Sequence, residues 1–240
     1  MGDFAEIWSY LAEGPLLWLT ATLVAYVIGD AAARAAGGAP LVNPVLVAVI
    51  LLAGMLWASG TPYPVYLEGA QFVHFMLGPV TVALAVPLHA NLGQLRKAAL
   101  PALAALLAGS LTAVVAALGV AMAFGVDFAT LASLAPKSAT APVAIGVSET
   151  LGGSPTLTAV LVILTGLIGA VVATPLLNAL GIRDWRARGF AVGVAAHGIG
   201  TARALQVNER AGAFAGIGMA LNAVLTALLA PWALAVMAAQ

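Results

Sequence analysis

The chain has 240 residues, of which 62% are hydrophobic and only 8% are charged, and its formal net charge is zero. This composition and a mean hydropathy of +1.07 are typical of an integral membrane protein and exclude a soluble globular domain. The zero net charge gives no support for nucleic-acid binding. The chain has no cysteine, which excludes disulfide bonds and cysteine-ligated metal sites.

Four long stretches contain no Lys, Arg, Asp or Glu, namely residues 35–67, 98–126, 150–182 and 211–240. Each exceeds the roughly 20 residues with which a helix crosses the hydrocarbon core. Helices are expected because a membrane-spanning strand needs about 10 residues of strict alternation, which the sequence lacks. The fold class predicted is therefore all-α: a polytopic membrane helix bundle of about seven to eight hydrophobic segments, forming a single transmembrane domain over residues 1–240.

Charges and helix breakers mark the ends of the predicted membrane spans. In chain order these spans are residues 15–34, 44–59, 71–92, 101–124, 154–182 and 211–236. Asp30 and Arg34 can pair on the first helix, because they stand four residues apart. Residues 60–64 predict a turn, and the Gly-Pro pair at 78–79 together with Pro87 predicts a kinked or broken third span.

Two further apolar segments, about residues 128–150 and 189–207, are each interrupted in the middle. The interruptions read Pro136-Lys137-Ser138-Ala139-Thr140-Ala141-Pro142 and His197-Gly198-Ile199-Gly200-Thr201-Ala202-Arg203. Irregular backbone at membrane depth is tolerated only where it is buried in protein or lines a cavity, and ionisable groups there mark functional sites. These two segments are therefore the first place to look for a substrate.

The path of the interrupted segments follows in part from the basic residues, which favour cytoplasmic loops. Arg34, Arg96-Lys97 and the cluster at residues 183–188 share one face if a single net crossing separates residue 124 from residue 183. This favours a re-entrant hairpin for residues 128–150, with limbs of about eight to ten residues that reach the middle of the bilayer. A broken helix that crosses fully has the same length, so both paths stay open at this point.

Repeated discontinuous helices indicate the midplane site of a transporter, where the N-termini of half-helices face an anion. The predicted substrate site comprises Lys137, Ser138, Thr140, His197, Gly198, Gly200, Thr201 and Arg203. In it Lys137 and Arg203 are counter-charges, and the hydroxyls of Ser138, Thr140 and Thr201 are donors. His197 is the candidate for proton coupling, or else a second donor, because histidine titrates near neutral pH. The implied ligand is a small anion with hydrogen-bonding oxygens.

Each of these residues also has a structural interpretation. Lys137 can extend to the interface and serve only topology. Ser138 and Thr140 can cap the second limb or bond to carbonyls of the preceding turn. His197 can be a core histidine bonded to a carbonyl. No metalloprotease, nucleophile-elbow or phosphate-loop motif occurs, so no enzyme activity, cofactor or metal is expected.

Several motifs of the chain match those of a known family in order and spacing. They are Asn43-Pro44, Leu77-Gly78-Pro79, Val86-Pro87-Leu88, Pro136-Lys137-Ser138 with Thr140 and Pro142, Thr165-Gly166 with Gly169, and Ala196-His197-Gly198-Ile199-Gly200-Thr201-Ala202. From about residue 40 to the C-terminus the chain thereby resembles the LrgB/CidB family. Ala141 departs from the family pattern, which has a hydroxyl there, and this leaves Ser138 and Thr140 as the donors.

The resemblance implies two functions. Bacterial relatives are described as holin-like or antiholin-like proteins that regulate murein hydrolase export and autolysis with a small LrgA/CidA-like membrane partner. Plastid relatives exchange glycolate and glycerate, and some bacterial pairs are associated with pyruvate. We therefore expect a secondary transporter of small monocarboxylates that works by alternating access in the cell inner (plasma) membrane, with the holin-like role as the alternative. Faces of small residues are compatible with a homodimer.

Overall fold

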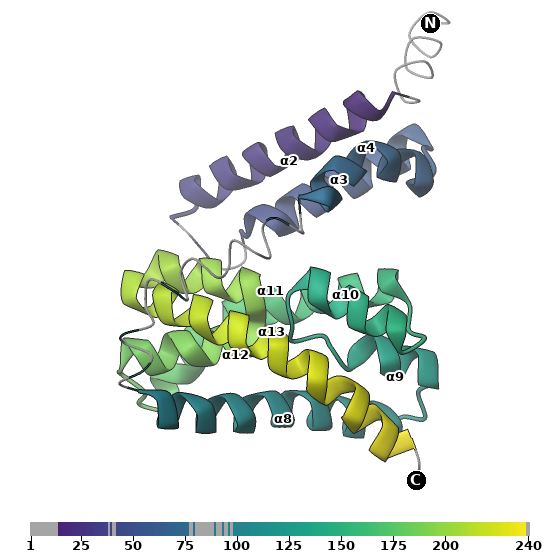
Figure 1. The fold of residues 1–240 in the computed structure, drawn as a ribbon. Helices are drawn as coiled ribbons and strands as arrows, with labels where there is room; N and C mark the ends of the chain where they lie inside the picture. Colours follow the sequence, from purple (N-terminus) through teal and green to yellow (C-terminus); the bar gives the residue numbers. More distant parts are fainter. Residues whose placement is uncertain are drawn as a thin grey trace, which may run out of the picture. The chain divides into compact units, whose positions relative to one another are not determined.

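The computed structural model describes residues 14–37, 39, 42–76, 79, 89, 93, 96 and 98–238. Contacts divide the chain into two compact units, Met1–Val80 and Thr81–Gln240. All regular elements in the described ranges are helices, which confirms the all-α prediction (Figure 1). Four of these helices are long and apolar enough to cross a membrane: Leu16–Ala35, Ala99–Ala123, Pro155–Ala179 and Glu209–Met237. The protein is therefore a multi-pass membrane protein.

The first unit contains α2 (Pro15–Ala35), α3 (Pro44–Ser59) and α4 (Tyr63–Phe75). Asn43 caps α3 by accepting a hydrogen bond from the backbone of Val45 at 2.9 Å. The predicted ion pair between Asp30 and Arg34 is present, with 2.7 Å between Oδ2 and Nη2. Trp18 is fully buried, with its ring edge-on to that of Tyr66.

The third predicted span begins earlier than the sequence suggested. The prediction placed a turn over residues 60–64 and a helix from residue 71, but α4 already begins at Tyr63. The reason is that Pro64 falls in the first helical turn, where its missing N–H would have no partner in any case. The kink predicted at residues 78–79 and Pro87 lies largely outside the described residues.

The second unit is built around three long helices, α8 (Ala99–Ala123), α11 (Pro155–Ala179) and α13 (Glu209–Ala238). Their outward side chains stay apolar and exposed, as a lipid environment requires; Leu228 of α13, for example, is 69% exposed. Between them lie the two interrupted segments. Figure 1 shows α9 and α10 near the end of α8 that lies close to the C-terminus, and α12 toward the other end.

The first interrupted segment is a re-entrant hairpin, which we call hairpin 1. Its limbs are α9 (Phe128–Leu134) and α10 (Ala141–Thr150), and residues 135–140 between them form turns. The first limb follows the end of α8, and the second limb leads back to the start of α11. The turn reaches mid-depth, because the carbonyl of Ser138 accepts a hydrogen bond from Asn222, which in turn binds Ser110 near the middle of α8. This geometry agrees with the re-entrant path that the basic residues favoured.

The second interrupted segment, α12 (Trp185–Val207), is also a hairpin, which we call hairpin 2. Its backbone leaves the helical region at Ala196 (φ −129°, ψ 17°) and His197 (φ 39°, ψ −135°). The chain then folds back, since a Cβ on Gly200 would lie 3.0 Å from a methyl carbon of Val192 in the limb before the break. The sequence left open whether this segment crosses, and the structure shows that it returns.

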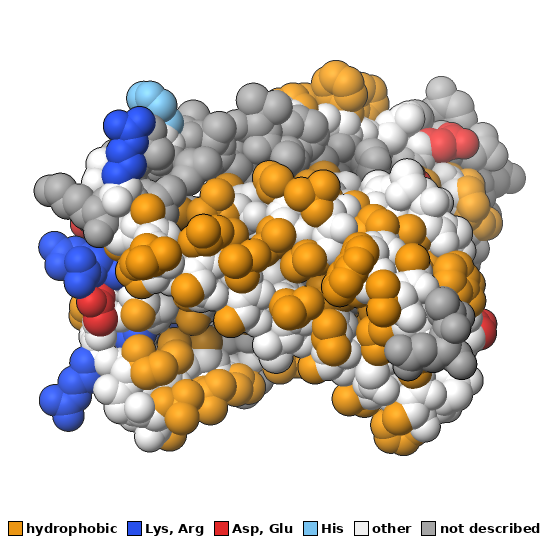
Figure 2. Space-filling model, turned by 60° about the horizontal axis from the view of Figure 1, so that its bottom comes forward, with side chains coloured by type: hydrophobic (Ala, Val, Ile, Leu, Met, Phe, Trp, Pro, Cys, Tyr) orange, Lys and Arg blue, Asp and Glu red, His pale blue; other side chains and the backbone are white. Residues whose placement is uncertain are grey.

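The two hairpins enter the second unit from opposite ends. Ala98 at the start of α8 lines the same groove as Asp184 and Arg186 at the start of hairpin 2. The basic cluster at residues 183–188 therefore lies at the end where α8 begins, whereas hairpin 1 begins and ends where α8 ends. On the face shown in Figure 2, the visible Lys and Arg side chains gather at one end, and the surface between the ends is mostly hydrophobic or neutral.

Hairpin 2 packs against α13 with the two backbones in contact. A Cβ added to Gly189 or Gly193 would collide with the backbone of Ala211 or Ala215 on α13. Such close approach through small residues is a common means of helix association in membranes, because the hydrophobic effect does not drive helices together in lipid. Hairpin 2 and α13 thus form one block.

Candidate functional site

The breaks of the two hairpins meet at one residue of α11. Nε2 of His197 in hairpin 2 lies 2.8 Å from the carbonyl oxygen of Val162. The side chain of Val162 packs in a buried cluster with Ala139, which lies in the break of hairpin 1, and with Ala144 of α10. Two sequence motifs that stand more than fifty residues apart therefore converge in the middle of the second unit.

The N-terminus of α10 presents a buried hydroxyl that has no partner in the described structure. Thr140 is the N-cap residue, with extended backbone angles (φ −64°, ψ 148°), but its side chain makes no capping bond. The residue is 8% exposed, and its Oγ1 is buried without a hydrogen bond. The first N–H groups of a helix also lack helical acceptors. A buried, unsatisfied hydroxyl costs about 1–3 kcal/mol, so Thr140 leaves a buried donor without an acceptor at the N-terminus of α10.

Lys137 brings the positive charge to this N-terminus. It lies in the turn of hairpin 1, half-buried, with Nζ 3.3 Å from the hydroxyl of the buried Ser138. The ion pairs recorded for the described residues are Asp30–Arg34 and Asp184–Arg186, so no described carboxylate neutralises Lys137.

His197 forms the turn of hairpin 2 and is 4% exposed. Its φ of 39° is the one positive φ of a non-glycine residue in the part of the chain described. Such backbone strain persists where the surrounding structure imposes it, and it is common at functional sites. Because the carbonyl of Val162 can only accept, Nε2 is the donor of their hydrogen bond. The neutral ring then carries its lone pair on Nδ1.

The remaining predicted residues of hairpin 2 lie apart from this point of convergence or are already engaged. The hydroxyl of Thr201 donates to the carbonyl of His197 at 2.7 Å, the bond typical of hydroxyls inside helices. Gly200 is buried against Val192, and Gly198 is exposed near Met219. Thr140 is therefore the one predicted hydroxyl residue whose hydroxyl is recorded as buried without a bond.

The structure places Arg203 toward the basic end, not at the breaks. It lines a small cleft with Trp185 and Arg188, between α11 and the two limbs of hairpin 2. Its Nη1 lies 3.4 Å from Oε1 of Gln206. The predicted pair of counter-charges, Lys137 and Arg203, is thus distributed over two places in the second unit.

Sequence reasoning missed Arg188. This guanidinium is only 8% exposed, donates to the amide oxygen of Asn178 at 2.8 Å and to the carbonyl of Ile182 at 2.9 Å, and stacks on Trp185. It thereby satisfies oxygens at the C-terminal end of α11, where a cation is favoured. In the sequence it is one of three arginines at a predicted interface, and nothing there distinguishes it from its exposed neighbours.

Aspartates cap the first limb of each hairpin. Asp127 accepts from the backbone of Thr130 at 2.7 Å, and hydrogen bonds from Thr130 hold the pKa of this carboxyl below its ordinary value. Asp184 accepts from the backbone of Arg186 at 2.8 Å and pairs with its guanidinium. Hydrogen bonds from Arg186 lower the pKa of Asp184 to about 2. Both limbs therefore begin with a negative charge at the positive end of the helix dipole.

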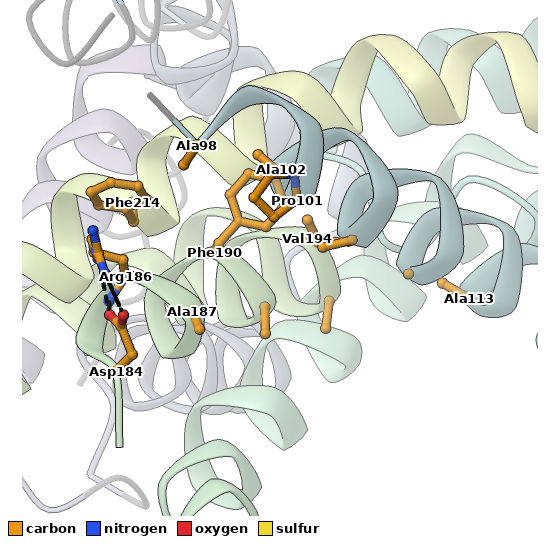
Figure 3. A pocket seen from close by; sticks show the side chains of 14 residues that line it. Ala98, Pro101, Ala102, Ala113, Asp184, Arg186, Ala187, Phe190, Val194 and Phe214 are labelled. Atoms are coloured by element: carbon orange, nitrogen blue, oxygen red, sulfur yellow. Dashed lines mark hydrogen bonds and ion pairs between the residues drawn. The ribbon is translucent and has the colours of Figure 1, made fainter. Parts of the chain in front are cut away.

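An apolar groove lies elsewhere in the second unit (Figure 3). It measures about 520 Å³ and lies between α8 and the first limb of hairpin 2. In Figure 3, Phe190 and Val194 face Pro101 and Ala102 across it, and the charges shown are those of the Asp184–Arg186 pair at one end. A groove with so few donors does not suit a small carboxylate, and the break residues do not line it.

The chain is similar to proteins of Staphylococcus and Bacillus. The model of the LrgB-like family matches residues 22–236. The holin-like protein CidB of Staphylococcus epidermidis is 37% identical over 192 residues, which are 80% of this chain and 84% of the relative. The protein YxaC of Bacillus subtilis is 36% identical over the same shares. CidB of Staphylococcus aureus is 34% identical, again over 80% of this chain and 84% of the relative. None of the solved structures matches.

Proposed function

The chain belongs to the LrgB-like family, and we propose that it is a carrier of small monocarboxylates such as glycolate, glycerate or pyruvate. The observation that carries this proposal is the buried, unpartnered hydroxyl of Thr140 at the N-terminus of α10. A half-helix N-terminus with a nearby cation in the middle of a membrane protein suits one carboxylate and an adjacent oxygen.

In this proposal the carboxylate accepts hydrogen bonds from the Thr140 hydroxyl and from the first N–H groups of α10. The ammonium of Lys137 supplies the counter-charge, which no described carboxylate takes. His197 carries a proton on Nδ1, the nitrogen that its bond to the Val162 carbonyl leaves available. Arg203 serves as a second positive charge nearer the basic end, on the route between the site and that surface.

Alternating access is supported by the arrangement of the hairpins. One enters from each end of the second unit, and their breaks lie near the same residue, Val162. Inverted elements around a midplane site are the arrangement from which carriers expose a site to each side in turn. We further propose that the basic end faces the cytoplasm and that the membrane is the inner (plasma) membrane, because basic loops stay inside. We also propose that the chain works with an LrgA/CidA-like membrane partner and forms a homodimer.

The experiment that tests the proposal is uptake of labelled glycolate, glycerate and pyruvate into liposomes that contain the purified chain. Saturable uptake, accelerated by the same acid inside or by an imposed pH gradient, is the expected result. Thr140→Val should abolish most of this uptake, whereas Thr165→Val, which changes a hydroxyl bonded to its own helix at Leu161, should not. Absence of uptake by well-inserted protein, both alone and with an LrgA/CidA-like partner, would overturn the carrier.

A second function is favoured by the names of the relatives, two of which are called holin-like. In this alternative the chain regulates murein hydrolase export and autolysis, and the hairpins serve assembly instead of substrate binding. A pore-forming protein should release solutes with little discrimination and with a steep dependence on protein density. Leakage of an unrelated neutral dye together with the acids would favour this function over the carrier.

A further inference from the structure

Asn222 connects the break of hairpin 1 to two long helices. It lies on α13 and is fully buried. Its Nδ2 donates to the carbonyl of Ser138 at 2.9 Å, and its Oδ1 accepts from the hydroxyls of Ser110 at 2.6 Å and Thr226 at 3.2 Å. One amide group thereby joins α8, α13 and the interrupted segment.

The orientation of this amide follows from the chemistry of its partners. The backbone carbonyl of Ser138 can only accept, so the nitrogen of the amide must face it. The oxygen then faces the two hydroxyls, which can donate. The arrangement is directional: rotating the amide by half a turn would set its oxygen against the Ser138 carbonyl and leave a buried acceptor unsatisfied.

The hydrogen bond from Asn222 to the Ser138 carbonyl holds the turn of hairpin 1, which lies outside the helices α9 and α10. Within the turn, backbone bonds run from Lys137 to Leu134 and from Ala139 to Pro136, but the Ser138 carbonyl has no recorded backbone donor. Ser138 precedes Thr140 by two residues. Fixing the Ser138 carbonyl therefore restrains the peptide units from which Lys137 and Thr140 project.

The same stretch of α13 also contacts hairpin 2. The sulfur of Met219, one turn before Asn222, lies 3.8 Å from the hydroxyl of Thr201. A Cβ added to Gly198 would lie 3.8 Å from the same sulfur. Contacts to both breaks thus come from a single turn of α13. A bond from this turn to Ser138 fixes hairpin 1 relative to the packed block of hairpin 2 and α13.

We propose that Asn222 is a positioning residue of the carboxylate site: it holds the break of hairpin 1 so that the Thr140 hydroxyl and the N-terminus of α10 face the ligand. This inference rests on the proposed carrier function. It differs from the plain interpretation of a buried asparagine, in which the amide adds only interhelical stability. The two interpretations predict different behaviour at the site itself.

The test uses the absence of cysteine from the chain. Ala141→Cys places a single thiol on the first residue of α10, which is only partly buried, and its reaction rate with a small thiol reagent is measured with and without glycolate or pyruvate. Asn222→Leu and Asn222→Gln are then added separately. Ser110→Ala is the matched control, because it removes a partner of the same amide and leaves the bond to Ser138 in place. Thermal unfolding is recorded for every variant.

The expected result is that Asn222→Leu changes the thiol reaction rate and raises the acid concentration for half-maximal protection about tenfold, the effect of one lost hydrogen bond of the stronger kind. Asn222→Gln, which keeps the amide, should restore part of the affinity and provides the test if Asn222→Leu does not fold. Ser110→Ala should lower the unfolding temperature without altering rate or protection. An unchanged rate in Asn222→Leu, or equal changes in Asn222→Leu and Ser110→Ala, would overturn the positioning role.

Failure of the proposed function gives a different pattern. If neither acid protects the thiol in the parent protein with Ala141→Cys alone, the carboxylate site is wrong. The reaction rate without ligand still reports whether Asn222 controls the conformation of the break. The two proposals can therefore fail separately.

Discussion

At the scale of single residues, the candidate site depends on a few side chains whose environments differ more than their residue types suggest. Ser138, Thr140 and Thr201 are all hydroxyl residues in the two breaks. The Thr201 hydroxyl is satisfied by its own helix and the Ser138 hydroxyl lies near Lys137, while that of Thr140 is buried without a bond. The structure thus separates one ligand-binding candidate from two residues of the same class.

Replacing Thr140 tests whether the orphan hydroxyl serves binding at the expense of stability. Thr140→Val keeps the shape and removes the unsatisfied hydroxyl, whose burial costs about 1–3 kcal/mol. We expect an unfolding temperature that is unchanged or higher, together with at least tenfold weaker glycolate binding. Thr201→Val removes a satisfied bond and should show the reverse, with lower stability and little change in binding. Calorimetry and equilibrium binding check both. Loss of stability without loss of binding in Thr140→Val would refute the assignment.

Two glycines provide a second test at this scale. A Cβ on Gly166 would lie 2.7 Å from Cε1 of His197, so Gly166→Ala should displace the break of hairpin 2 and destabilise the protein by about 1–3 kcal/mol. Gly146 lies within α10 and has open space around it, so Gly146→Ala should stabilise by up to about 1 kcal/mol. Denaturant unfolding of the two variants measures the difference. Equal effects would mean that Gly166 does not support the turn.

At the scale of elements, each hairpin is held both at its base and at its turn. Hairpin 1 is bonded at its base where the Thr158 hydroxyl lies 2.7 Å from that of Ser148, and at its turn by Asn222. Hairpin 2 is held at its base by Arg188 and at its turn by the bond from His197 to Val162. Short broken helices are marginal on their own, so these contacts give them their form.

The stability that Asp184 contributes at the base of hairpin 2 should decrease at low pH. Pairing with Arg186 lowers the pKa of Asp184 to about 2, below the unfolded value of about 3.9. The ionised carboxylate therefore contributes stability above about pH 4, and this contribution disappears as the pH falls toward 2. The difference in unfolding temperature between the wild type and Asp184→Asn should be constant from pH 7 to pH 5 and shrink below pH 4. Arg186→Gln should shift that loss to higher pH; an unshifted profile would contradict the pairing.

At the scale of the whole molecule, the topology rests on two hairpins that each return to the end from which they start. Ala98 and Asp184 line one groove, which puts the entry of α8 and the base of hairpin 2 at the same end of the second unit. The charges agree with this, since residues 183–188 are basic and Asp127 and Glu149 mark the opposite end. The polarity of the loops and the path of the backbone therefore agree.

Single cysteines in the cysteine-free chain test this topology. Thiols from Val126→Cys and Thr150→Cys should react from one side of the membrane, and those from Arg183→Cys and Gln206→Cys from the other. A fully crossing segment at residues 128–150 would place the first two on opposite sides. The readout is labelling by an impermeant thiol reagent in oriented vesicles, with labelling after permeabilisation as the control for accessibility.

The sequence by itself determined the class of the protein, most of its spans and the location of its breaks. Long uncharged stretches can only be stable as membrane helices, and both breaks coincide with motifs that combine Pro or Gly with polar side chains, so both features are local. Tertiary structure alone decided that residues 189–207 turn back, that His197 and hairpin 1 meet at Val162, and that Arg203 lies elsewhere. The physical reason is that a break fixes where a helix ends but not the direction that follows. That direction depends on contacts such as those of Gly189 and Gly193 with α13, between residues distant in the chain.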